Sequence, residues 1–172
     1  MTSNHLVLLL TATLLLPACG GAQTDSCLPV VEGMDGGTPF ILPDSVGSLR
    51  VPPLTTEEPL GRNSHGRRLI LEDSTIIHVW VTPQPAAGLS MSGPGRVEGV
   101  RNCETQVSGH LAIVSRFTVV PRATPREYMG MMNIVLDDST SANFTISTAT
   151  VASRDMMLGV VAHSLVFRGR RR

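Results

Sequence analysis

Apolar and polar residues alternate along much of the chain, and this period of two predicts β-strands. The clearest example is residues 74–82 (STIIHVWVT), where Ile77 and Val79 lie on one face and His78 and Trp80 on the other. The face that carries Ile77 and Val79 is the more apolar of the two. We therefore expect that face to point into the core.

Turn-forming residues divide the chain into ordered segments. Glu72-Asp73-Ser74 predicts a hairpin turn, and Gly109 is a second turn position. Residues 52–68 and 83–96 are rich in proline and glycine, so we expect both to be loops. The ordered segments expected before the C-terminal region are residues 40–51, 69–82, 97–120, 128–136 and 142–151.

The period changes close to the C-terminus. Apolar residues recur at helical spacing between Met156 and Val161. Ser153 is the expected N-cap of this helix, and Asp155 would favour the first helical turn through its charge. Residues 165–167 then read as a short final strand.

These elements predict an α+β fold in which the C-terminal helix packs on an antiparallel β-sheet. The alternative is an all-β sandwich or barrel with the helix as a lone covering element. The order strand, strand, helix, short strand from Tyr128 to Phe167 ends in Ser164-Leu165-Val166-Phe167. It resembles the C-terminal half of the Mog1/PsbP-like α/β sandwiches, a group that includes some bacterial lipoproteins. This resemblance contains no specific motif, and it implies an antiparallel sheet but no activity.

The N-terminus carries a separate signal. The residues from Leu6 to Leu16 are almost continuously apolar. A helix that spans a bilayer needs about 20 such residues, so this segment is too short. An apolar segment of this length at the N-terminus, followed by small residues, is typical of a secretory signal peptide.

The apolar segment ends in Leu16-Pro17-Ala18-Cys19, which resembles the lipobox of bacterial lipoprotein signal peptides. The resemblance implies cleavage before Cys19, two acyl chains on its thiol and often a third, such as palmitate, on its amine. Two or more acyl chains anchor a protein stably in a membrane. Pro17 and the lack of a basic residue in residues 1–5 depart from the family pattern. Gly20 resembles lipoproteins sorted to the outer membrane, facing the periplasm, in bacteria with two membranes.

The chain has three cysteines. If lipid occupies Cys19, then Cys27 and Cys103 remain, and in an oxidising cell envelope we expect them to form a disulfide. This disulfide would close a loop from Cys27 to Cys103, and the chain-entropy model predicts that it stabilises the folded protein by about 4 kcal/mol. The alternative is two separate buried thiols. Catalytic thiol chemistry is disfavoured because the chain has no C-x-x-C motif.

Composition indicates a single domain without a strong electrostatic field. The 14 basic and 14 acidic residues give a net charge of zero, so nothing favours binding to nucleic acid. We expect a signal peptide at residues 1–18, a lipidated N-terminus and short tether at 19–39, one β-rich domain at 40–168 and a basic tail at 169–172.

No catalytic or cofactor-binding motif is present in the sequence. Residues 88–93 (GLSMSG), which include Ser90, lack the G-x-S-x-G spacing of a nucleophile elbow. Asp137-Asp138-Ser139 lacks the rest of a calcium-binding loop. We therefore expect no enzyme activity and no cofactor. The histidines that lie outside any metal-binding pair are His65, His78, His110 and His163.

Methionines form the remaining cluster of interest. Met129, Met131 and Met132 lie on one expected strand, and thioethers are soft ligands that suit Cu(I). Strict alternation places Met129 and Met131 on one face and Met132 on the other, so the three cannot converge without a bulge. The favoured interpretation is that these side chains fill gaps in a core with few aromatic residues.

The sequence thus predicts a lipid-anchored protein of the cell envelope, whose partner through Cys19 is membrane lipid. We expect the folded domain to be a non-enzymatic accessory, binding or structural module. The alternatives are a copper-binding lipoprotein that uses Met129 and Met131, and an enzyme without a recognisable motif.

Overall fold

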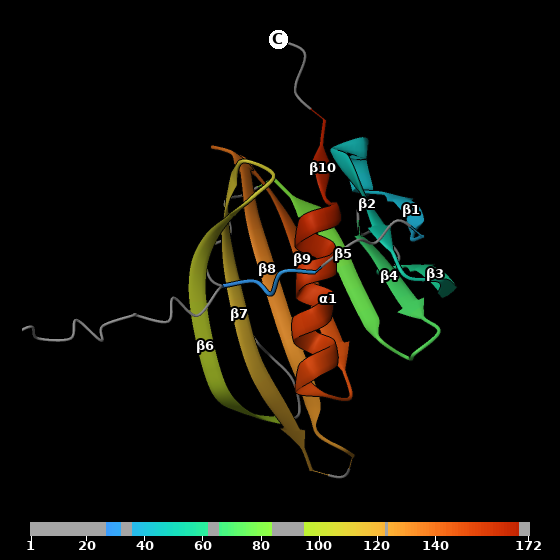
Figure 1. Cartoon of the computed structure of the whole chain (residues 1–172), viewed down its shortest axis with the longest axis vertical. Coiled ribbons are helices and arrows are strands. Elements are labelled where there is room, and N and C mark those ends of the chain that lie inside the picture. Colours follow the sequence, from blue (N-terminus) through green and yellow to red (C-terminus); the bar gives the residue numbers. More distant parts are fainter. Residues whose placement is uncertain (1–26, 32–35, 62–65, 84–94, 123, 169–172) are drawn as a thin grey trace, which may run out of the picture.

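The computed structural model describes residues 27–31, 36–61, 66–83, 95–122 and 124–168. These residues form two antiparallel β-sheets and one α-helix (Figure 1). The larger sheet has the strand order β3-β4-β5-β9-β8-β7-β6. Its strands are β3 (Leu54–Pro59), β4 (Gly66–Leu71), β5 (Ile76–Thr82), β6 (Gly95–Val107), β7 (His110–Pro121), β8 (Glu127–Asp137) and β9 (Thr140–Thr148).

A smaller sheet with the order β1-β2-β10 lies at one end of the helix α1 (Figure 1). The C-terminal strand joins it by pairing with β2, where Val166 lies opposite Ser48. Its elements are β1 (Thr38–Ile41), the 3-10 turn η1 (Pro43–Ser45), β2 (Gly47–Val51) and β10 (Val166–Phe167), and α1 spans Val151–Ser164.

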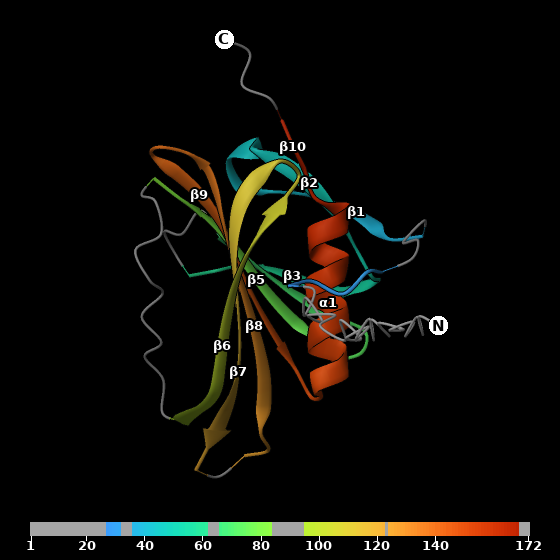
Figure 2. The same ribbon diagram turned by 60° about the vertical axis from the view of Figure 1, so that its left-hand side comes forward.

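The helix α1 covers one face of the large sheet, as the turned view in Figure 2 shows. Leu158 and Val161 are fully buried against the sheets, together with Ile77 and Val79 of β5. The expected α+β fold is confirmed, and so is the expectation that Ile77 and Val79 point into the core. The sheet is open, with β3 and β6 at its edges.

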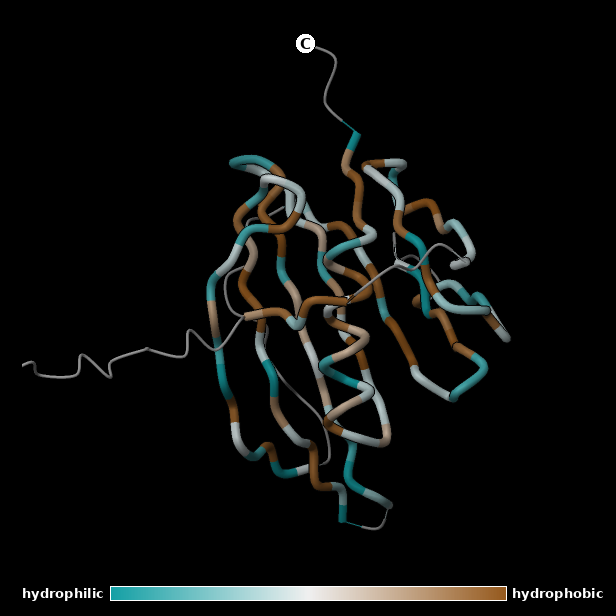
Figure 3. The backbone as a smooth tube through the Cα atoms, in the orientation of Figure 1, coloured by the Kyte–Doolittle hydropathy of each residue, from teal (hydrophilic) through white to brown (hydrophobic). Residues whose placement is uncertain are grey.

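Hydrophobic and hydrophilic residues alternate along the strands of the large sheet (Figure 3). In β7, Ala112 and Val114 are buried on the helix side, whereas Leu111 is half exposed on the other side. Gly109 has a φ of +80°, which confirms it as a turn position between β6 and β7. The alternation therefore predicted the strands well wherever one face of the sheet is covered by α1.

The helix begins earlier than the sequence predicted. The N-cap is Thr150, whose side chain accepts a hydrogen bond from the backbone N–H of Ser153, so Ser153 lies inside the helix. Asp155 is consequently beyond the first turn. Thr150 takes this role because β9 ends at Thr148, which leaves Thr150 extended directly before the first helical residue.

The expectation of a loop at residues 52–68 is wrong, because β3 and the start of β4 lie within this range. Residues of β3 alternate between half-buried and exposed, and none is buried. An edge strand without a buried face lacks the apolar alternation by which strands are recognised, and the proline of β3 stands at its end. Its polar sequence LTTEEP therefore looked like a loop.

The segment Cys27–Val31, here called the strap, crosses the outer side of α1 (Figure 1). A disulfide joins Cys27 to Cys103 of β6, with a Cα–Cα distance of 5.8 Å. Leu28 and Val31 pack against the core, and the strap is largely hydrophobic (Figure 3). The part of the chain expected to be a tether thus contains the strap and the first residues of β1.

The strap and the helix touch at Gly159. A Cβ atom at this position would lie 2.4 Å from Cγ2 of Val31 and 2.9 Å from the carbonyl oxygen of Pro29. Alanine is favoured over glycine inside a helix by about 1 kcal/mol. Here the close approach of the strap outweighs that preference, because overpacking costs about 1–3 kcal/mol.

We therefore expect Gly159→Ala to lower the free energy of unfolding in the oxidised protein, measured by urea denaturation. In a Cys27→Ser/Cys103→Ser background the strap can lift away, and the same change should be neutral or stabilising. Gly36→Ala is the matched control, since its Cβ would meet no atom within 4 Å. An equal cost of Gly159→Ala in both backgrounds would contradict the strap contact.

Candidate functional site

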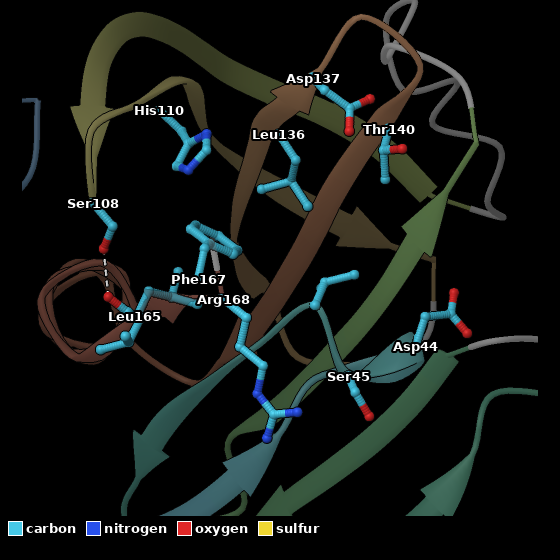
Figure 4. A pocket seen from close by; sticks show the side chains of 12 residues that line it. Asp44, Ser45, Ser108, His110, Leu136, Asp137, Thr140, Leu165, Phe167 and Arg168 are labelled. Atoms are coloured by element: carbon cyan, nitrogen blue, oxygen red, sulfur yellow. Dashed lines mark hydrogen bonds between the residues drawn. The ribbon is translucent and has the colours of Figure 1, made fainter. Parts of the chain in front are cut away.

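A cavity of about 990 Å³ lies where one end of the large sheet faces the small sheet (Figure 4). The β6–β7 and β8–β9 turns form one side of it, and η1 and β10 form the other. Sites for small molecules usually have volumes of about 300–1,000 Å³. Residues that line this cavity include Asp44, Ser108, His110, Leu136, Asp137 and Phe167.

Left-handed backbone conformations shape two of the cavity walls. Asp44 and Ser45 in η1 have φ values of 56° and 54°, and Ser108 in the β6–β7 turn has a φ of 50°. Residues other than glycine rarely adopt this conformation, and each instance is typically unfavourable by about 1–2 kcal/mol. Ser108 precedes Gly109 in a two-residue hairpin turn, where positive φ values are usual, whereas the conformation of Asp44 and Ser45 is of the kind often found at binding and active sites.

The cavity combines an apolar wall with a polar rim. The rings of His110 and Phe167 meet edge to face, with their centroids 5.0 Å apart and their planes at 77°. Leu136 points into the same space, while Asp137 and Thr140 lie beside it at the β8–β9 turn (Figure 4). A lining of this kind suits a small molecule that has both an apolar body and a polar group.

Two polar side chains of the cavity form hydrogen bonds within the fold. The hydroxyl of Ser108 donates to the carbonyl oxygen of Leu165, not to His110 (Figure 4). Oδ1 of Asp137 accepts hydrogen bonds of 2.9 Å from the backbone N–H and from the hydroxyl of Ser139. Within the described lining, no hydroxyl forms the hydrogen bond to an imidazole that a Ser-His pair requires.

The methionine candidates lie elsewhere, on the face of the large sheet opposite α1. Met129 and Met131 share this face, as alternation predicted, and Met132 is buried on the helix side. The register partners of Met131 are Ser115 and Thr145, and neither of these two side chains is a soft ligand. In the described part of the chain, no group of three His, Cys, Asp or Glu residues could hold a metal ion.

His78 occupies the same face as Met131, two strands away. Its register partners are Arg68 on β4 and Thr145 on β9. Partial burial lowers the pKa of His78, and the positive charge of Arg68 lowers it further. Arg68 is itself held by Glu58 of the edge strand, with Nη1 3.3 Å from Oε2.

Of the remaining candidates, His163 is described and does not line the cavity. His163 lies at the end of α1, where its Nδ1 is 2.8 Å from the carbonyl oxygen of Gly159. The proposed lipidation site Cys19, as well as His65 and Ser90, lies outside the residues that the structure describes.

No protein-family model matches the chain, and no curated protein matches it significantly. Among the described residues, no helix has the length and the apolar character needed to cross a membrane.

Sequence reasoning did not find the cavity. His110 and Asp137 appeared in the sequence only as an isolated histidine and as a fragment of a calcium loop. The fold brings them together with Phe167, which lies far along the chain. The sequence feature that could have pointed to the cavity is the position of His110 and Asp137, because both flank tight turns of long hairpins.

The lowered pKa of His78 makes the stability of the protein depend on pH. Well above pH 6.5, the ordinary pKa of a histidine, the imidazole is neutral in both the folded and the unfolded state. Below that value the unfolded chain takes up a proton more readily than the folded protein, so the free energy of unfolding should fall as the pH drops. We expect His78→Gln to flatten this dependence between pH 7.5 and pH 5.5 in urea titrations, whereas the exposed His163→Gln should leave it in place. An unchanged slope in His78→Gln would refute this assignment.

Proposed function

We propose that the protein is a lipid-anchored component of a bacterial cell envelope, and that its folded domain binds a ligand or partner without catalysing a reaction. The observation that carries the anchor is the use of the cysteines. The disulfide occupies Cys27 and Cys103. Of the three cysteines in the chain, this leaves Cys19, which stands at the end of the lipobox-like sequence.

The disulfide also supports an exported location, because such bonds persist in oxidising compartments. Eight peptide units separate Cys19 from Cys27. Fully extended, this length reaches about 26–29 Å, so a lipid on Cys19 would hold the domain close to the membrane surface.

The cavity supports the binding role. Its volume, its apolar wall around Phe167 and the left-handed backbone at Asp44 and Ser45 are features of a preformed ligand site. The hydroxyl of Ser108 donates to the carbonyl oxygen of Leu165, so this hydrogen bond joins the β6–β7 turn to the segment before β10 at the cavity wall. The copper alternative with Met129 and Met131 stays a prediction without an added structural argument.

The anchor is tested by metabolic labelling with an alkyne analogue of palmitate in a bacterial host. The protein should be labelled and should fractionate with membranes. Cys19→Ser should lose the label and be released or remain as the uncleaved precursor. Cys27→Ser/Cys103→Ser is the matched control and should keep the label. Labelling of Cys19→Ser at the level of the unchanged protein would refute the anchor.

The binding role is tested by NMR with a fragment library of small aromatic compounds that carry one polar group. Fragments that occupy the cavity should shift the signals of His110 and Phe167. His110→Ala removes the edge-to-face contact between His110 and Phe167. This change should weaken the binding of the fragments several-fold, by about 1 kcal/mol. His163→Ala changes a side chain that does not line the cavity and should leave the affinities unchanged. A library without any fragment that shifts these signals would contradict the binding role of the cavity.

A further inference from the structure

Two arginines face each other across a strand pair on the helix side of the large sheet. Arg101 of β6 is the direct register partner of Arg116 of β7. Like charges at directly opposed positions destabilise a sheet. Arg101 is exposed, and in the described part of the chain no carboxylate lies within ion-pair distance of it.

A third arginine adds to this positive charge. Arg154 lies near the N-terminal end of α1 and is only 8% exposed. Its Nε donates to Oδ1 of Asp155 at 2.8 Å, and Nε of Arg116 lies 3.1 Å from the same oxygen. The N-terminal end of a helix is itself partially positive, so this is an unfavourable position for a buried guanidinium.

The carboxylate of Asp155 therefore serves the buried Arg154 and the half-buried Arg116, and it leaves the donors of Arg116 incompletely satisfied. The contact from Nε of Arg116 lacks hydrogen-bond geometry, and this nitrogen is a buried donor without an acceptor. The next carboxylate on the same face of β6 is Glu98, which pairs with Arg96. Among the described residues, the three residues Arg101, Arg116 and Arg154, here called the arginine cluster, thus carry more positive charge than the one carboxylate that contacts them, Asp155, neutralises.

The arginine cluster lies where the N-terminal chain enters the fold. Nη2 of Arg116 donates to the carbonyl oxygen of Cys27 at 2.6 Å. Cys103, the disulfide partner of Cys27, is two positions from Arg101 along β6 and on the same face. A lipid on Cys19 would consequently enter the membrane within a short distance of the arginine cluster.

We propose that the arginine cluster binds the phosphate of an anionic phospholipid in the membrane that holds Cys19. This inference rests on the proposed lipid anchor for its choice of a lipid phosphate over a free one. Arg101 supplies the accessible guanidinium, whose planar fork matches two phosphate oxygens. Arg116 and Arg154 are held by Asp155 and Cys27, and they strengthen the positive potential at that position.

The experiment uses a chain that begins at Gly20, which keeps every described residue but lacks both the apolar segment and Cys19. Its binding is therefore independent of the lipid anchor, and failure of one proposal is separate from failure of the other. Co-sedimentation with vesicles of phosphatidylglycerol and phosphatidylcholine is compared with pure phosphatidylcholine vesicles at low salt. We expect binding to the anionic vesicles only.

Arg101→Gln should weaken this binding about fivefold, since one arginine near an anionic surface contributes on that order. Arg168→Gln is the matched control, because it removes the same charge from an exposed residue beside the cavity. Equal losses in the two variants would show a response to net charge alone and would overturn the proposal. Binding of inorganic phosphate without binding to anionic vesicles would overturn the lipid as its source.

Urea denaturation without vesicles separates a binding role of Arg101 from a structural one. Removing one of two opposed like charges should leave Arg101→Gln as stable as the unchanged protein, or more stable. A variant that binds more weakly yet unfolds at an equal or higher urea concentration supports the proposal. A loss of stability in Arg101→Gln would assign the residue to the fold and overturn it.

Discussion

Burial of the apolar side of α1 is the interaction on which the other features depend. The helix contacts β8 and β9 of the large sheet and β2 of the small sheet. Leu158 and Val161 are fully buried, and burial of a side chain of this size contributes about 2 kcal/mol. Because both sheets pack on the same helix, the cavity between them exists only while α1 is in place.

Two glycines permit the close contacts on the two sides of this helix. At Gly130 of β8, a Cβ would lie 3.0 Å from the side chain of Leu158, so the absence of one brings the helix close to the sheet. The absence of a side chain at Gly159 likewise lets the strap approach the outer side of the helix closely. The disulfide then ties the strap to the edge strand β6, which places α1 between the sheet and a covalently held segment (Figure 2).

The charged groups around α1 are less completely paired than its apolar side chains are buried. An arginine remains charged when it is buried, so Arg116 and Arg154 must be compensated inside the fold. Asp155 and the carbonyl oxygen of Cys27 compensate them in part. Violations of this kind, in a fold whose apolar pattern is regular, tend to mark functional surfaces. The lipid anchor and the arginine cluster would then act on the same side of the molecule.

Local patterns in the sequence determined the strands, the turns, the existence of the C-terminal helix and the α+β class. These follow from side-chain periodicity and turn chemistry, which depend on near neighbours in the chain. The same local patterns failed at β3, where an edge strand has no buried face, and at the N-cap, where the end of β9 decides between Thr150 and Ser153. The number of cysteines in the sequence, with Cys19 assigned to lipid, also predicted the disulfide between Cys27 and Cys103.

Only the tertiary structure decided which distant residues share a site. His110 and Phe167 form one wall of the cavity because β10 pairs with β2 at the end of the large sheet where the β6–β7 turn lies. Arg101 and Arg116 oppose each other because of the register of β6 and β7, and Arg154 joins them through the packing of α1. Strand order, register and helix placement arise from contacts between residues far apart in the chain, and no local period in the sequence records them.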